Sequence, residues 1–213
     1  MTKVFKEKEF LSELTSKNSP KISQKIKTIS IGIAGCGGLG SNTAIALVRA
    51  GVRNLVIVDF DKVEISNLNR QQYSIRDVGN YKVDSLERIL ISINPYMKIS
   101  KHKIKLNSKN ISEIFKDCKI VIEAFDTVSS KSMIIKAFSE ELFKDKYLVA
   151  GSGVAGFDSA NKIKTKRIAG NIFICGDNKT APAKINGIMA PRVMITAGHQ
   201  ANKALQLIAG LKG

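Results

Sequence analysis

The chain lacks several features that would place it in a specialised class of protein. Tryptophan is absent, and the three cysteines, at positions 36, 118 and 175, form no pair with metal-ligand or redox spacing. No apolar run approaches the ~18 residues needed to span a membrane. The first residues contain no apolar stretch typical of a signal peptide. Because an odd, scattered set of cysteines is typical of a reducing compartment, we expect a cytoplasmic protein with no membrane partner.

Negative charge is also scarce in this chain. Lys and Arg number 34 against 18 Asp and Glu, which gives a net charge of +16, and lysine supplies 27 of the basic residues. Such a charge fits nucleic acid, an anionic substrate, an acidic partner or simply a lysine-rich solvated surface. Nucleic-acid binders usually combine arginine clusters with stacking aromatic residues, and this sequence shows no such motif. We therefore expect no nucleic-acid partner, while an anionic substrate, an acidic partner and a solvated surface all stay open.

Length and composition indicate one globular domain with a short N-terminal extension. The chain has 213 residues, of which 44% are hydrophobic and 24% charged. Residues 1–27 are polar and lysine-rich, with apolar residues spaced as in a modest amphipathic helix. We predict an N-terminal helical segment over residues 1–27 and a single domain over residues 28–213.

Strands and helices alternate along this domain. Strands are predicted over residues 28–34, 54–59, 97–106, 119–123 and 147–150, and helices over residues 41–50, 81–93, 111–116, 129–143 and 191–211. Residues 162–167 and 171–175 alternate like antiparallel strands, whereas residues 62–80 and 177–190 are predicted to be loops. The order predicts an α/β fold: a Rossmann-like, doubly wound, mainly parallel sheet with an antiparallel C-terminal extension.

A glycine-rich loop lies between the first predicted strand and its helix. Gly35, Gly37 and Gly40 satisfy G-x-G-x-x-G, and Gly38 adds a further glycine. Glycines allow a tight turn and the close approach of a phosphate to backbone N–H groups at a helix N-terminus. Asp59 ends the next strand, where a ribose-binding carboxylate belongs. These residues predict a nucleotide site, and the motif alone leaves NAD, FAD and ATP open.

The loop after the second predicted strand favours a polyphosphate. It is rich in polar and charged side chains, namely Asp59, Asp61, Asn67, Asn69, Arg70 and Gln71, and Lys82 opens the next helix. A dehydrogenase has no need of an arginine and a lysine at the phosphate end. A nucleotidyl-transfer enzyme must neutralise a triphosphate and its pyrophosphate leaving group. This loop therefore favours ATP.

Taken together, six segments resemble the ThiF/MoeB/HesA family, the bacterial relatives of ubiquitin-activating enzymes. They are GCGGLGS, VDFDKVEISNLNRQ, GNYKVDS, INP, EAFDT and GIMAPRV, in family order. The AGSGVAGF and MAPRVMITAGHQAN segments look most like the short ThiF-type branch linked to thiamine biosynthesis. The resemblance implies a homodimer that uses ATP and Mg²⁺. It also implies that this enzyme adenylates the C-terminal glycine carboxylate of a ThiS-like, ubiquitin-fold sulfur carrier ending in Gly-Gly, and releases pyrophosphate.

The resemblance also implies roles for the matching residues. Catalytic roles fall to Arg70, Lys82 and Asp126, and nucleotide-binding roles to Gly35, Gly37, Gly38, Gly40, Asp59, Asp61, Asn67, Asn69 and Gln71. Asp59 would hold the ribose hydroxyls, and Asp126 would bind Mg²⁺, which prefers hard oxygen ligands. A substrate carboxylate is already ionised at pH 7 and needs no general base. Catalysis would therefore consist mainly of positioning and charge neutralisation.

The sequence departs from the family pattern at several positions. The two C-x-x-C pairs that bind zinc in many members are missing, so we predict no zinc. The loop before the MAPRV segment has no cysteine, and Cys175 is either a buried strand-end thiol or a relocated sulfur-handling nucleophile. No arginine precedes Arg49, and Lys131 stands where relatives often have arginine. Lysine cannot form the bidentate fork of arginine.

Besides a thiamine-pathway adenylyltransferase, three functions stay open from the sequence. The first is adenylation for molybdopterin or another sulfur-carrier pathway, because these pathways share the chemistry. The second is a non-catalytic module that binds a nucleotide or a carrier. The third is an NAD(P)-dependent oxidoreductase, which would use the same glycine fingerprint.

Overall fold

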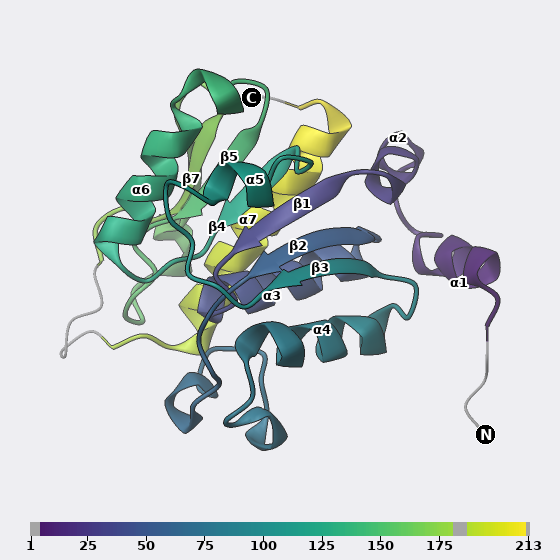
Figure 1. The fold of residues 1–213 in the computed structure, drawn as a ribbon, viewed down its shortest axis with the longest axis horizontal. Helices are drawn as coiled ribbons and strands as arrows, with labels where there is room; N and C mark the ends of the chain where they lie inside the picture. Colours follow the sequence, from purple (N-terminus) through teal and green to yellow (C-terminus); the bar gives the residue numbers. More distant parts are fainter. Residues whose placement is uncertain (1–4, 181–186, 212–213) are drawn as a thin grey trace.

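The computed structural model describes residues 5–180 and 187–211, and its centre is a seven-stranded sheet with helices on both faces (Figure 1). The strands are β1 (Ser30–Ala34), β2 (Asn54–Val58), β3 (Lys98–His102), β4 (Ile120–Glu123), β5 (Tyr147–Gly151), β6 (Lys164–Ala169) and β7 (Ile172–Gly176). Their spatial order is β3-β2-β1-β4-β5-β7-β6. Neighbouring strands are parallel except for β6 and β7. The predicted fold class is confirmed.

The helices also follow the predicted order. They are α1 (Glu7–Leu14), α2 (Pro20–Ser23), α3 (Gly38–Arg49), α4 (Lys82–Ile93), α5 (Ile111–Ile114), α6 (Val128–Phe138) and α7 (Ala190–Ala209). The helix predicted over residues 129–143 is too long, because α6 stops at Phe138 and a separate 3-10 turn covers Glu141–Phe143. The break lets the Phe143 ring stack on that of Phe138, with centroids 4.4 Å apart. Within the described ranges, no helix is both long enough and apolar enough to cross a membrane.

The chain reverses its direction across the sheet at β1. From β1 it proceeds outward through β2 to β3, and then returns to β4 and continues the other way through β5 to β7. The loops that follow β1 and β4 therefore leave neighbouring strands in opposite directions. Sheets of this kind bind ligands at the carboxyl ends of two such strands.

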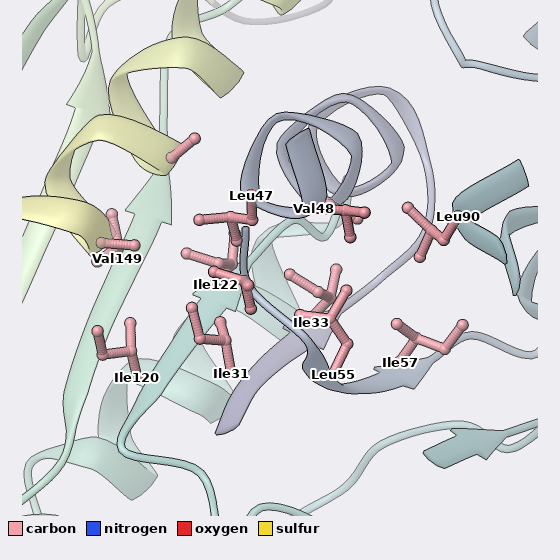
Figure 2. Close-up of a cluster of buried hydrophobic side chains, with 14 of the residues drawn as sticks. Ile31, Ile33, Leu47, Val48, Leu55, Ile57, Leu90, Ile120, Ile122 and Val149 are labelled. Atoms are coloured by element: carbon pink, nitrogen blue, oxygen red, sulfur yellow. The ribbon is translucent and has the colours of Figure 1, made fainter. Parts of the chain in front are cut away.

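Helices cover both faces of the sheet, which explains why the central strands are continuous apolar runs in the sequence. Figure 2 shows one face, where strand residues lie beneath Leu47 and Val48 of α3 and beside Leu90 of α4. The strand residues of that cluster include Ile31, Ile33, Leu55, Ile57, Ile120, Ile122 and Val149. The opposite face carries a second cluster that includes Phe115, Val121, Ile134, Phe138 and Leu148. With both faces packed, the strand ends are held rigidly.

The N-terminal segment lies against the rest of the chain. Ile26 is fully buried in the larger core cluster, and the Asn18 side chain donates to the Ala50 carbonyl oxygen at 2.8 Å. The rings of Phe10 and Tyr96 are in contact, with centroids 5.7 Å apart. The division of the chain between residues 27 and 28 stays a prediction, and these contacts cross it.

Two helical glycines give a direct test of this packing. A Cβ atom at Gly40 in α3 would overlap the carbonyl oxygen of Gly35, whereas a Cβ atom at Gly198 in α7 would meet nothing within 4 Å. We expect Gly40→Ala to lower the free energy of unfolding by about 3 kcal/mol, because backbone must move. Gly198→Ala should raise it by about 0.5–1 kcal/mol through helix propensity. Urea denaturation measures both values, and equal stabilities would contradict the packing described here.

Candidate active site

The glycine loop begins where β1 ends. Gly35 has a positive φ of 97°, which favours glycine, and an added Cβ there would lie 2.9 Å from the carbonyl oxygen of Ala124. The loop after β1 therefore lies directly against the loop after β4. Helix α3 starts at Gly38, and no side chain of the described residues caps it at Gly37. Its first-turn N–H groups are thus available to an anion.

Arg70 and Gln71 lie beside this loop, as predicted. An added Cβ at Gly38 would lie 3.6 Å from Arg70 Cγ, and one at Gly37 would lie 3.7 Å from Gln71 Nε2. Asn42 of α3 holds the arginine segment in place, because its Nδ2 donates to the carbonyl oxygens of Gly38 at 2.7 Å and Arg70 at 3.1 Å. Asn42 was not predicted from the sequence, and its place in GLGSN was the available signal.

Asp59, Asp61 and Lys82 form a connected group at the end of β2. The Asp59 carboxylate accepts from the N–H groups of Cys36 at 2.7 Å and Asp61 at 2.8 Å. Asp61 Oδ2 in turn lies 2.8 Å from the ammonium of Lys82. Burial raises the pKa of Asp59, and the nearby Lys82 charge and the two hydrogen bonds oppose that rise. The structure thus brings two carboxylates and a basic residue to the glycine loop.

The segment between β2 and α4 leaves the sheet and returns to it. An isolated bridge between Lys62 and Tyr81 closes this segment at its base. The Tyr73 hydroxyl fixes it to the glycine loop by donating to the Cys36 carbonyl oxygen at 2.7 Å. Tyr73 was also missed, since a tyrosine in a polar loop shows no distinctive spacing.

Asn67 and Asn69 make contacts other than those expected of nucleotide ligands. The Asn67 side-chain oxygen accepts from the N–H of Glu64 at 3.1 Å, in a capping box that shapes the turn preceding Arg70. Asn69 donates to the Ile188 carbonyl oxygen at 3.0 Å and accepts from the Arg70 guanidinium at 2.8 Å. In these contacts both side chains position Arg70. Their nucleotide-binding roles stay predictions.

Asp126 is exposed in the loop after β4, where its carboxylate is accessible. Helix α6 is capped by Thr127, whose hydroxyl oxygen accepts from the N–H of Ser130 at 3.3 Å. The capping role at the start of α6 therefore belongs to Thr127 and not to Asp126. Among the described residues, no group of three or more His, Cys, Asp or Glu side chains could hold a metal ion. A magnesium role for Asp126 stays a prediction.

Cys175 lies in the core on β7. It is fully buried, and its sulfur lies 3.4 Å from the Thr165 hydroxyl oxygen. Burial raises the pKa of the Cys175 thiol to about 11, so the thiol stays protonated at neutral pH. Because the thiolate is the reactive form, the structure favours a strand-end core thiol over a sulfur-handling nucleophile.

A buried ion pair at the start of α7 was missed entirely. Arg192 donates to Asp177 Oδ2 at 2.6 Å and to the Asp158 carbonyl oxygen at 2.7 Å, and the side chains of Arg192 and Asp177 are almost completely buried. The pair fixes the first turn of α7. In that turn Val193 lies 3.1 Å from the Cβ position of Gly38. No periodicity in the sequence pairs an aspartate and an arginine fifteen positions apart.

A glycine loop, a strand-end carboxylate and basic residues thus lie at the reversal point of a doubly wound α/β sheet, the place where such sheets bind ligands. The model of the ThiF family matches residues 11–213, and the chain belongs to that family. The resemblance found in the sequence is thus confirmed.

Curated relatives of this chain are named adenylyltransferases. The sulfur carrier protein adenylyltransferase of Thermus thermophilus is 33% identical over 116 residues, which cover 54% of this chain and 43% of that protein. The adenylyltransferase and sulfurtransferase UBA4 of Scheffersomyces stipitis is 28% identical over 199 residues, which cover 90% of this chain and 44% of that protein. The chain thus spans less than half the length of these relatives.

Solved structures share the fold. The tRNA N6-threonylcarbamoyladenosine dehydratase TcdA of E. coli, in complex with ATP, superposes with a TM-score of 0.83 at 20% identity. That match covers 94% of this chain and 93% of TcdA. E. coli MccB with AMPCPP and MccA gives a TM-score of 0.68 at 19% identity, covering 90% of this chain and 59% of that one. At these identities the likeness concerns the fold.

The ion pair between Arg192 and Asp177 should dominate the stability of this region. We expect Arg192→Met to lower the free energy of unfolding by about 3 kcal/mol, because Asp177 stays buried without its counter-charge. The double variant Asp177→Asn/Arg192→Met should recover much of that loss, and Lys162→Met, at an exposed ion pair, should change little. Urea denaturation checks these values; full stability of the single variant would contradict the assignment.

The same pair predicts a pH dependence. Burial raises the pKa of Asp177, but N–H groups of Thr180 and Lys179 and the Arg192 charge outweigh it, so the net pKa lies below its usual value. A lowered native pKa adds stability above the unfolded pKa of about 4, and this is lost as the pH falls through the native pKa. The stability advantage of the wild type over the double variant should be constant above about pH 5 and should shrink as the pH falls below about 4 and through the native pKa.

Proposed function

We propose that this protein is an ATP-dependent adenylyltransferase. It activates the C-terminal glycine carboxylate of a ThiS-like, ubiquitin-fold sulfur carrier and releases pyrophosphate. The single observation that carries the proposal is the placement of Arg70 and Lys82 around an uncapped helix N-terminus at the reversal point of the sheet. A nicotinamide cofactor would give those two cations no task, whereas a triphosphate needs both.

The residues present fit an ATP molecule. The first turn of α3 offers N–H donors to phosphate oxygens, and glycines at 37 and 38 leave room for close approach. The Asp59 carboxylate is half-buried at the end of β2, where it would accept hydrogen bonds from ribose hydroxyls. ATP is therefore proposed as the substrate, with its sugar beside β2 and its phosphates over the glycine loop.

The proposed reaction is an in-line displacement. The carrier carboxylate attacks the α-phosphorus of ATP, the bond from the α-phosphorus to the bridging oxygen breaks, and pyrophosphate leaves. Negative charge develops on the phosphoryl oxygens, and Lys82 and Arg70 would stabilise it. Lys82 is already paired with Asp61, so its ammonium is oriented before the substrate arrives. The carboxylate needs no base.

Asp126 is the proposed magnesium ligand. Mg²⁺ is usually held by one or two carboxylates together with substrate phosphates, so one exposed aspartate in the loop after β4 fits this donor set. When bound, the ion would neutralise charge on the phosphates. Asp126 would supply a carboxylate oxygen as a ligand to the ion, from a fixed place opposite the glycine loop.

The proposal also names a biosynthetic pathway and an oligomeric state. We assign the carrier to thiamine biosynthesis because of the short ThiF-type segments, and we propose a homodimer on the same resemblance. The Thermus thermophilus relative, named a sulfur carrier protein adenylyltransferase, supports a carrier partner. Adenylation for molybdopterin or another pathway is the alternative. Binding of NADH without ATP would instead support an oxidoreductase, and ATP binding without turnover a non-catalytic module.

The test is ATP–pyrophosphate exchange with Mg²⁺ and Gly-Gly-ended sulfur carriers from the same cell. Arg70→Ala should lower carrier-dependent exchange at least about 100-fold, because a group that neutralises the triphosphate is removed. The matched control is Arg76→Ala in the same segment between β2 and α4, where Arg76 lies exposed beside Ser74.

The outcomes separate the candidate functions. Exchange that needs a carrier identifies both the reaction and the partner. An Arg70→Ala variant with the activity of the wild type would overturn the assignment of the site. Absence of exchange with every carrier, despite tight ATP binding, would replace the adenylyltransferase by the non-catalytic module.

The net charge of +16 predicts how an acidic carrier would bind. Opposite charges raise the association rate, and salt screens them. The KM for the carrier should rise on the order of tenfold between low and physiological salt, with kcat nearly unchanged. Exchange measured across a salt series checks this. A KM that is insensitive to salt would show that the lysine-rich surface takes no part in docking.

A further inference from the structure

A carboxylate with no role so far is buried beside the proposed site. Glu123 is the last residue of β4, and its side chain is fully buried at the strand end next to β1. One carboxylate oxygen accepts from the N–H of Phe125 at 2.7 Å, and the other accepts from the N–H of Gly151 at 3.3 Å. Glu123 thus joins the end of β4 to its own following loop and to the end of β5.

Lys131 of α6 supplies the counter-charge. Its ammonium lies 2.8 Å and 3.1 Å from the two oxygens of Glu123, and 2.7 Å from the carbonyl oxygen of Gly151. An ammonium has three donors, and these contacts use all of them. Lys131 is therefore fully committed to the ends of β4 and β5, and it does not point toward a substrate.

The turn that Glu123 and Lys131 hold is the one that carries Asp126. The bond to the Phe125 N–H fixes the turn immediately before Asp126, and the Thr127 cap fixes α6 immediately after it. The same turn backs the glycine loop, because the Cβ position of Gly35 lies 2.9 Å from the Ala124 carbonyl oxygen. A displacement of this turn would move Asp126 relative to the phosphate-binding loop.

We infer that Glu123 and Lys131 are positioning residues for adenylation, which place Asp126 opposite the glycine loop without touching the substrate. This inference rests on the proposed function. It explains why a charged pair is kept at a strand end where apolar residues would pack. A displacement of about 1 Å at a reacting centre can lower a rate about 100-fold.

The charges around Glu123 predict a pH dependence that tests this positioning role. Burial raises the pKa of Glu123, and Lys131 opposes the rise, as do the N–H groups of Phe125 and Gly151. From α7, the neutral Gln200 donates to the Glu123 backbone carbonyl oxygen at 2.9 Å. Among the described residues, Lys131 is the charged side chain that lowers the Glu123 pKa. Without Lys131 the carboxyl group would gain a proton at a higher pH, and its hold on the turn would become pH-dependent.

The first experiment measures pyrophosphate exchange of Lys131→Met from pH 6 to pH 9. We expect kcat to fall about 100-fold at pH 7 with the KM for ATP within about threefold, and to rise with pH as Glu123 ionises. Lys131→Arg keeps the charge and should show no such rise. Lys136→Met, in the last turn of the same helix, is the control and should match the wild type.

The double variant Glu123→Gln/Lys131→Met guards against misfolding. It removes both charges, so it should fold even if the buried lone carboxylate of the single variant does not. Because Gln is neutral like a protonated Glu123, its exchange rate should equal the low-pH limit of Lys131→Met and should not change with pH. A loss of kcat, ATP binding and melting temperature in parallel, without any pH effect, would show a merely structural pair and overturn the inference.

A second readout does not depend on turnover. ATP binding is measured with and without Mg²⁺ for the wild type, Lys131→Met and Lys136→Met. The inference predicts that Lys131→Met keeps magnesium-free binding and loses most of the strengthening by Mg²⁺, because Asp126 is displaced. If the wild type shows no exchange but this pattern holds, the proposed function fails and the positioning role stands. If Lys131→Met equals the wild type in both readouts, the positioning role is wrong.

Discussion

The structure depends on one close contact, the approach of the glycine loop to the backbone at the end of β4. Gly35 permits it, because a Cβ there would lie 2.9 Å from the Ala124 carbonyl oxygen, and Gly40 lets the first turn of α3 lie against the Gly35 carbonyl oxygen. The contact brings the loops after β1 and β4 together at the point where the sheet reverses its order. Asp59 then accepts from the loop N–H at Cys36, which ties the end of β2 to the same place. Three strand ends thereby become one rigid platform.

Around this platform, three carboxylates are each matched by a cation from another element. Asp61 has Lys82 at the start of α4, Glu123 has Lys131 of α6, and Asp177 has Arg192 of α7. In the two pairs whose carboxylates are buried, those of Glu123 and Asp177, loss of the cation leaves an uncompensated charge, which is far more costly than the pair is favourable. The helices are therefore held at the strand ends by charge as well as by apolar packing. The excess of basic residues in the whole chain gives no sign of this local pairing of opposite charges.

The sheet and the glycine loop could be predicted from the sequence, because each leaves a periodic or spaced signal. Apolar runs marked the buried strands, and G-x-G-x-x-G marked the turn between β1 and α3. The contacts of Asn42, Tyr73 and the Asp177–Arg192 pair could not be predicted, because they join residues far apart in the chain. Asn67 shows the converse: its position in a motif predicts a ligand, while its side chain completes a capping box.

The bridge between Lys62 and Tyr81 has a wider consequence. The segment between β2 and α4 carries Arg70, and the two ends of this segment meet at the bridge. A segment whose two ends already meet can change in length or composition without moving the strands that support it. The side chains that this segment presents to the glycine loop can therefore vary while the strands keep their places. In this architecture, the residues that can vary and the residues that maintain the fold lie in separate stretches of the same chain.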